Sequence, residues 1–268
     1  AREATGKGGN IDAFITENLS LASGGVIIAD TFSVNAAGSV TVRVGNIDVD
    51  SRGRGATGIF SQSHAAGDAG TVDVSATGRV TLSNGGLIST TSFAVGNAGS
   101  VRVAARSLAI DRHRNETAPG VAAMAAGQSG NAGQVDVLVA EELTILRGGG
   151  ISSSTRSTGV ARSVFVSAGA IRVDGIGPYD SHSVISASAA ASSSGQTGSV
   201  VVRAGDIVLS DGGRVSISND ATVANAAAIT PTSITVTAPR ITIQNSPDAI
   251  TTKSTGNVAA GNIRINAA

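Results

Sequence analysis

Hydrophobic and polar residues alternate in short runs that return about every thirty residues along the chain. Each run begins with Gly and a small polar residue, and two β-branched residues then flank one outward residue, as in 38–42 (GSVTV) and 99–103 (GSVRV). The copies begin at residues 9, 38, 70, 99, 133, 162, 198, 232 and 261, at spacings of 29 to 36 residues, and Arg162 and Thr232 replace the glycine. Near-constant spacing of this size predicts a solenoid with one structural rung per period.

Two further strand-like segments follow each copy. The second segment of each repeat begins nine or ten residues after the start of the first, as in 47–49 (IDV) and 143–145 (LTI). The third is less regular, and its centres are Ile27, Ile59, Ile88, Ala122, Ile151, Ile185, Val215 and Ile250. Alternation with period two predicts strands, Gly, Asn and Ser predict turns between them, and no stretch combines helical periodicity with start and stop signals. The sequence therefore predicts an all-β fold, a right-handed parallel β-helix with three strands per rung and about eight rungs.

Equivalent strands of successive rungs are expected to pair in parallel about 4.8 Å apart, which stacks their inward residues into columns. One expected column consists of Val40, Val72, Val101, Val135, Val164 and Val200, and a second of Val42, Val74, Val103, Val137, Val166 and Val202. Outward residues of alternating sign, Asp73, Arg102 and Asp136, become vertical neighbours. Phe165 and Val201 continue that row as apolar residues. They are either a contact patch or residues covered by a nearby loop.

Composition narrows the classes of function. The 268 residues carry no net charge, so no basic stripe favours nucleic acid, and no apolar run reaches membrane-spanning length. The absence of cysteine excludes disulfides and thiol chemistry. Because the repeat fills the chain, we expect a single domain over residues 1–268, cut from a longer protein. Its uncapped strand edges also predict head-to-tail self-association into a filament as an alternative.

Acidic residues offer one suggestive set. Asp50, Asp111 and Asp174 each follow the second strand of alternate rungs, which places them about 9.6 Å apart along one corner. That separation is at the far limit for inverting glycosidases, whereas Asp also commonly starts a turn by bonding its own backbone. We favour the turn interpretation and predict no catalytic residues, although a polysaccharide-processing enzyme stays an alternative.

Longer, more varied loops follow these aspartates. They contain Arg52, Arg54, Arg112, His113, Arg114, Tyr179, Asp180 and His182. Insertions on one face of a solenoid are where binding tends to be placed, and arginine pairs suit sulfated or carboxylated glycans. The sequence therefore predicts either a glycan-binding strip or a solvated decoration.

Other motifs give little chemistry. The three histidines, His64, His113 and His182, lie in different rungs, so we expect no metal site and no cofactor. Asn97 and Asn131, in the repeated phrase Gly-Asn-Ala-Gly, are expected to take left-handed turn conformations, with Asp68 in their place in another rung.

The repeat phrases resemble those of filamentous-haemagglutinin-type exoproteins. The phrases are 85–92 (GGLISTTS), 96–103 (GNAGSVRV), 130–133 (GNAG) and 149–155 (GGISSST). The resemblance implies a right-handed β-helix that is exported by two-partner secretion through an outer-membrane transporter and is displayed at, or released from, a Gram-negative cell. The function that we expect is therefore an extracellular structural or adhesive shaft, with surface glycans or a host or neighbouring cell surface as partners.

Overall fold

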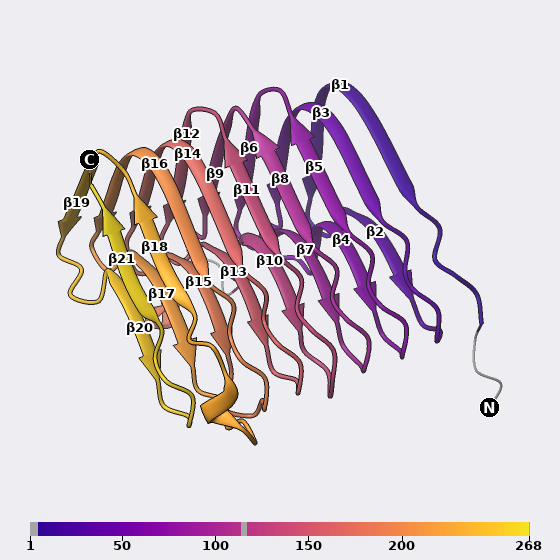
Figure 1. Ribbon diagram of the computed structural model, residues 1–268. Coiled ribbons are helices and arrows are strands. Elements are labelled where there is room, and N and C mark those ends of the chain that lie inside the picture. The colour runs from indigo at the N-terminus through magenta and orange to yellow at the C-terminus, as the bar shows by residue number, and fades with distance from the viewer. Residues whose placement is uncertain (1–4, 114–116, 268) are drawn as a thin grey trace.

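The computed structural model describes residues 5–113 and 117–267, and parallel strands stack in it to form a β-solenoid (Figure 1). The axis of the solenoid runs from β1 near the N-terminus to β21 near the C-terminus. In the described residues there are two 3₁₀ helices, η1 (Pro178–Asp180) and η2 (Ala226–Ala228), and no α-helix. The predicted all-β parallel solenoid of about eight turns is confirmed, and its right-handed sense stays a prediction.

The first and second segments of the repeats lie in one 13-stranded sheet. In four turns they merge into a single long strand, namely β1 (Ile11–Ala22), β3 (Val40–Asp50), β14 (Val164–Asp174) and β16 (Val200–Ser210). Elsewhere the first segments are β5 (Val72–Ala76), β8 (Val101–Ala105), β11 (Val135–Val139), β18 (Ser233–Thr237) and β21 (Asn262–Asn266). The separate second segments are β6 (Arg79–Ser83), β9 (Ser107–Asp111), β12 (Glu142–Leu146) and β19 (Arg240–Gln244). The expectation of three separate strands in every rung is therefore not confirmed.

The third segments form an eight-stranded sheet with one strand per turn. Its strands are β2 (Val26–Thr31), β4 (Thr57–Ser63), β7 (Gly86–Ser92), β10 (Gly120–Ala125), β13 (Gly150–Thr155), β15 (Val184–Ala189), β17 (Arg214–Asn219) and β20 (Ile250–Ser254). Val121, and not Ala122, pairs with Ile88 on one side and Ile151 on the other, so the expected centre of β10 was wrong by one residue.

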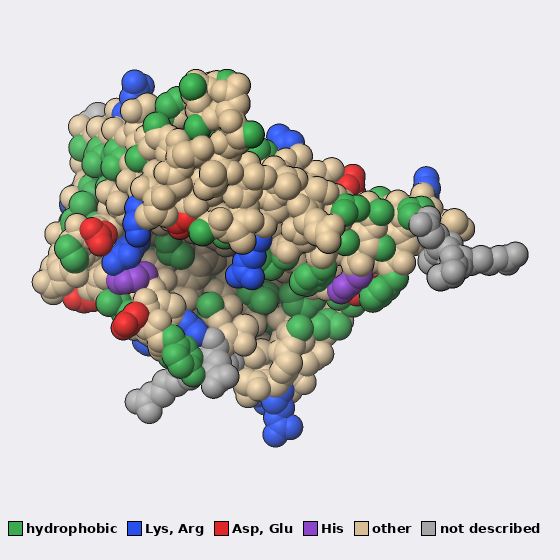
Figure 2. Space-filling view, turned by 90° about the horizontal axis from the view of Figure 1, so that it is seen from below, with side chains coloured by type: hydrophobic (Ala, Val, Ile, Leu, Met, Phe, Trp, Pro, Cys, Tyr) green, Lys and Arg blue, Asp and Glu red, His purple; other side chains and the backbone are tan. Residues whose placement is uncertain are grey.

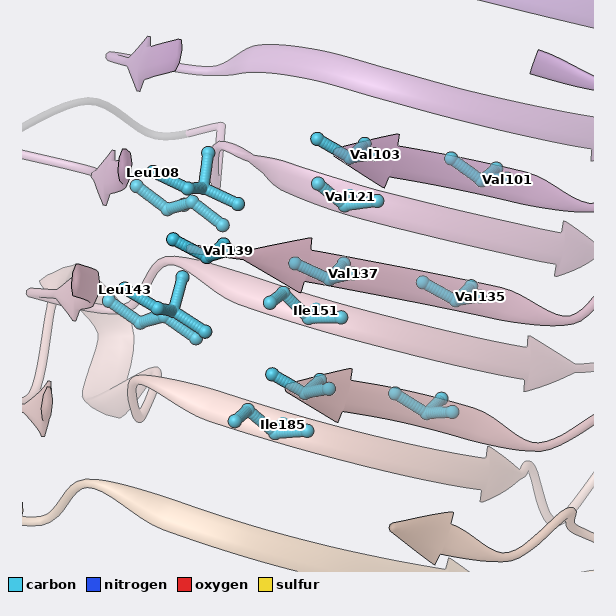
Figure 3. Close-up of a cluster of buried hydrophobic side chains, with 14 of the residues drawn as sticks. Val101, Val103, Leu108, Val121, Val135, Val137, Val139, Leu143, Ile151 and Ile185 are labelled. Carbon is cyan, nitrogen blue, oxygen red and sulfur yellow. The ribbon is translucent and has the colours of Figure 1, made fainter. Parts of the chain in front are cut away.

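Inward side chains of the two sheets form the core of the solenoid (Figure 3). Both expected valine columns are confirmed, because their members pair in register from turn to turn and every one is buried. Leu108 and Leu143 are buried core residues of the second segments, and Val121, Ile151 and Ile185 are buried core residues of the third segments. Each fully buried Val or Leu contributes roughly 1.5–3 kcal/mol to stability through apolar burial.

Glycine begins most copies of the repeat because neighbouring turns approach too closely there for a side chain. A Cβ added to Gly99 would lie 1.9 Å from the carbonyl oxygen of Gly70, and one added to Gly133 would lie 1.7 Å from that of Gly99. Real Cβ atoms do not make such contacts with backbone. The glycine column is therefore a requirement of stacking.

Asn97 and Asn131 do not take the left-handed conformation that we expected, because neither has a positive φ. Instead they extend a ladder of hydrogen bonds that begins at Asp68. Asp68 Oδ1 accepts from the backbone N and Nδ2 of Asn97 at 2.6 and 3.1 Å, and Asn131 Oδ1 accepts from the backbone N of Val160 at 2.9 Å. The repeated phrase thus holds successive turns together through its side chains.

Outward residues of the first segments are vertical neighbours as expected. Asp73 pairs in register with Arg102, and Arg102 pairs with Asp136. Within the described residues, no ion pair joins these three side chains, so their alternating sign supplies at most a weak, screened attraction.

At the C-terminal end, the side chains of the last strand are uncovered in this chain. Ile263 and Ile265 of β21 are 45% and 50% exposed, although they continue the inward columns of β18. Head-to-tail stacking of a second copy on this edge stays a prediction.

Candidate binding site

The aspartates that precede the longer loops lie in one column at the corner between second and third strands. Asp50 and Asp111 both pair in register with Ser83, and Asp111 and Asp174 both pair with Leu146. The expected separation of two rungs along one corner is therefore confirmed. We call the turns that follow these residues, 51–56, 112–113 and 175–183, the turn ridge.

Two of the aspartates start the turns as predicted. Asp50 Oδ1 accepts a hydrogen bond from the backbone N of Arg52 at 3.0 Å, and Asp111 Oδ1 accepts one from the backbone N of His113, also at 3.0 Å. Burial raises the pKa of the Asp50 carboxyl, but hydrogen bonds from Asn84 and Arg52 outweigh it, so the pKa lies below its ordinary value. Asp50 is therefore held as a carboxylate that orders the corner.

Asp174 is bound within the same corner. The Arg172 guanidinium donates to Asp174 Oδ2 at 2.5 Å, and the Ser210 hydroxyl donates to Oδ1 at 2.8 Å. These contacts outweigh the effect of burial and lower the pKa of Asp174, and the same ion pair raises the pKa of Arg172. The carboxylate thereby ties its own turn to the following one.

The first loop of the turn ridge presents arginines to solvent. Arg52 and Arg54 are both exposed. The Arg52 side chain is 64% exposed even though its Nε lies 3.6 Å from Asp50 Oδ2. Arg52 has a φ of 51° and Gly53 a φ of 73°, so a tight left-handed turn separates the two side chains. Exposed guanidinium groups are suited to bidentate contacts with carboxylate or sulfate.

Arg112 is buried, whereas a residue that binds a ligand at the surface must be exposed. It is 4% exposed, and its Nη1 donates to the carbonyl oxygen of Pro178 at 3.3 Å and to the hydroxyl of Ser181. Arg112 thus crosses two turns and holds the loop at 175–183 from beneath. Arg114, which we also expected in the strip, lies outside the described residues.

His113 is exposed and meets a residue that the sequence analysis did not single out. Arg147 Nη2 lies 3.1 Å from His113 Nδ1 and also donates to Asp111 Oδ2. Arg147 comes directly after the second strand of its own rung, in register with the turn ridge. This position in the repeat was the signal that would have identified it.

The third loop projects from the corner as a compact hairpin. Gly177 N donates to Ser181 O at 2.7 Å, Ser183 N donates to Gly175 O at 3.1 Å, and Ile176 forms an antiparallel bridge with His182. His182 Nδ1 lies 2.6 Å from the carbonyl oxygen of Gly212, so its imidazole binds the following turn.

Tyr179 and Asp180 form the tip of this hairpin. Tyr179 is 76% exposed, and the two residues have φ values of 59° and 54°. The left-handed region costs non-glycine residues of order 1–3 kcal/mol each, so the surrounding contacts must impose it. The loop thereby displays an aromatic ring and a carboxylate in a fixed orientation.

Phe165 and Val201 pair in register on the outward face of β14 and β16. Both are half-buried, and the guanidinium carbon of Arg203 lies 5.7 Å from the centroid of the Phe165 ring. The ring is therefore covered in part by a neighbouring side chain.

On the face seen in Figure 2, blue, purple and red groups lie next to one another in one area, and further charged groups stand apart on a surface that is largely tan and green. In the part of the chain that the structure describes, no three His, Cys, Asp or Glu residues are placed to hold a metal ion. Among the same residues, no helix has the length and apolar character needed to span a membrane.

Comparisons of the chain with protein-family models, with curated proteins and with solved structures give no match.

Proposed function

We propose that this chain is a structural and adhesive shaft of a secreted or surface-displayed bacterial protein. The observation that carries the proposal is the uninterrupted ladder of parallel strand pairs from β1 to β21, which makes each turn a spacer of fixed rise. Loops at one corner project from the ladder without interrupting its columns, and such loops commonly carry binding residues. A rod with displayed loops is suited to present binding groups at a distance from a surface.

The repeat phrases support the proposed location. Because they resemble those of filamentous-haemagglutinin-type exoproteins, we place the chain outside a Gram-negative cell after two-partner secretion through an outer-membrane transporter.

The ligands that we propose for the turn ridge are sulfated or carboxylated glycans on a host or neighbouring cell surface. Arg52 and Arg54 supply exposed guanidinium groups, and Tyr179 supplies an exposed ring on a rigid loop. Arg112 serves this surface from below as a support for the Tyr179 loop.

Binding of the soluble chain to immobilised heparin and to a neutral dextran of similar length tests the proposal. We expect retention on heparin that falls as ionic strength rises, because exposed charge contacts are screened over about 10 Å at 0.1 M salt. Replacing Arg52 and Arg54 with Ser should abolish most of this retention. The matched control replaces Arg102 and Arg264, two exposed arginines elsewhere on the solenoid, and should retain heparin binding. Equal loss in both double variants, or no binding by the wild type, would contradict an adhesive turn ridge.

A further inference from the structure

The outward face of the second segments, whose strands lead into the turn ridge, carries an open groove of about 670 Å³. It lies over the start of the second segments in the N-terminal half of the solenoid, from β1 to β9, and the Arg106–Glu141 pair borders it. Nine of its twelve lining residues are polar, and Ile47, which also lines it, belongs to the core. The side chains of the groove therefore stand on a rigid ladder.

The polar side chains of the groove form two rows parallel to the solenoid axis. Asn18, Asn46 and Arg79 occupy the same position in successive turns, and Ser20, Asp48 and Thr81 occupy the position two residues later. Turns are about 4.8 Å apart, and two residues of strand span about 6.6 Å. The surface thus repeats hydrogen-bonding groups on a regular lattice.

One row is held in place by its own hydrogen bonds. Asn46 Nδ2 donates to Asn18 Oδ1 at 3.0 Å, and the backbone N of Arg79 donates to Asn46 Oδ1 at 2.9 Å. These contacts fix the two amides, and within the described residues the side-chain amide N–H groups of Asn18 have no acceptor. The row is therefore ordered before any ligand arrives, which lowers the entropic cost of binding.

The second row has unused hydrogen-bonding capacity. Within residues 5–113 and 117–267, the side chains of Ser20, Asp48 and Thr81 have no hydrogen-bond or ion-pair partner, and the same holds for the Arg79 guanidinium. Asp48 offers acceptors only, Arg79 offers donors only, and each hydroxyl offers both. A ligand that satisfies them must alternate donors and acceptors at short intervals.

The charges of the groove are balanced. Arg79 and Asp48 carry opposite charges, and Arg106 Nε donates to Glu141 Oε1 at 2.9 Å at the border. A balanced site does not attract a polyanion as the arginines of the turn ridge do. The second segments over which the groove lies are also paired to neighbouring strands on both sides in β3, β6 and β9, so these strands offer an extended peptide no free edge.

We propose that this groove binds a neutral linear glycan whose chain lies along the solenoid axis. Its ring hydroxyls both donate and accept, as the Asp48, Thr81, Asn46 and Arg79 side chains require. The inference goes beyond the proposed function, because it uses different residues and a ligand without charge.

The test uses the full chain and soluble neutral glucose oligomers, β-1,4-linked and α-1,4-linked, of increasing length, with binding followed by calorimetry or by ligand-observed NMR. We expect affinity to rise with chain length until the oligomer spans the groove and to change little when salt is raised to about 1 M, where screening acts within about 3 Å. Asp48→Ala and Thr81→Ala should each weaken binding at least about tenfold, a loss of about 1.4 kcal/mol. Both side chains point outward and have no hydrogen-bond or ion-pair partner among the described residues, so circular dichroism should show unchanged folding.

Thr235→Ala, an outward threonine of β18 outside the groove, is the matched control and should bind like the wild type. The variant with Arg52 and Arg54 replaced should also keep neutral-glycan binding, which separates this site from the turn ridge. Absence of binding to every neutral oligomer would overturn the proposal, as would equal weakening in the Thr235 control. If the wild type binds neutral glycans but not heparin, the result would contradict only the proposal that the turn ridge binds charged glycans.

Discussion

The backbone N and the side-chain Nδ2 of Asn131 both donate to Oδ1 of Asn97 in the preceding turn, at 2.8 and 3.1 Å. Asn97 makes the same pair of bonds to Oδ1 of Asp68, so one side-chain oxygen of each turn satisfies two donors of the next. Linked hydrogen bonds of this kind polarise one another, and the loss of a central member leaves donors without partners on one side and an acceptor on the other.

Replacing Asn97 with Ala should lower the free energy of unfolding by about 1–3 kcal/mol, because it removes the acceptor of two Asn131 donors. Urea denaturation followed by circular dichroism measures the change. Asn10→Ala is the control, since Asn10 is exposed in the first turn and accepts a single bond from the backbone N of Ser39. An effect at Asn97 no larger than that at Asn10 would show that the ladder does not stabilise the stack.

Two neighbouring valines of β16 lie on opposite sides of the strand, one in the inward column and one on the outward face. Val202 is fully buried and Val201 is half-buried on the opposite side of the same strand. Val202→Ala should cost about 1–3 kcal/mol through lost burial and the cavity that remains. Val201→Ala should stay within about 0.5 kcal/mol, as surface substitutions usually do. Equal losses in thermal or urea unfolding would contradict the assigned direction of the two side chains.

The valine columns could be predicted from the sequence because strict alternation fixes which residues face inward. Where alternation is missing, the prediction failed by one residue. Residues 121–126 (VAAMAA) contain no polar residue, so the pattern alone does not distinguish Val121 from Ala122. Only pairing with Ile88 and Ile151, which adjacent turns provide, places Val121 inward.

The candidate site was less accessible to sequence reasoning. The turns begun by Asp50 and Asp111 depend on contacts two residues away, and these were predicted. The burial of Arg112 depends on Pro178 and Ser181, which lie 66 and 69 residues further along and reach it only because the third loop folds back over two turns. Contacts at such separations leave no local pattern in the sequence.

Asp174 predicts a dependence of stability on pH. Hydrogen bonds from Arg172 and Ser210 lower its pKa in the folded protein below the ordinary value of 3.8, so the unfolded chain binds the proton more tightly. The stabilisation is therefore present above about pH 4 and is lost as the pH falls through the folded pKa. In urea unfolding at a series of pH values, Asp174→Asn should be less stable than the wild type near neutrality, and the gap should narrow in acid. A gap independent of pH would contradict this origin, and Asp73→Asn, which removes no ion pair within the described residues, should show no such gap.

Arg112 is predicted to act as a positioning residue for the Tyr179 loop. Arg112→Met keeps much of the buried volume but removes the charged donor to Pro178 O and Ser181 Oγ, and the loss of these hydrogen bonds should cost about 1–3 kcal/mol. Strain at Tyr179 and Asp180 is then no longer opposed from below, so the loop should open. Amide hydrogen exchange at Ser181 and Ser183, whose N–H groups close the hairpin, should accelerate in the variant while exchange in β14 and β16 changes little. The control Arg54→Met removes an exposed arginine of the same ridge and should leave both amides protected. If Ser181 and Ser183 exchange at the wild-type rate in Arg112→Met, the loop is held by its own hairpin bonds and Arg112 is not its support.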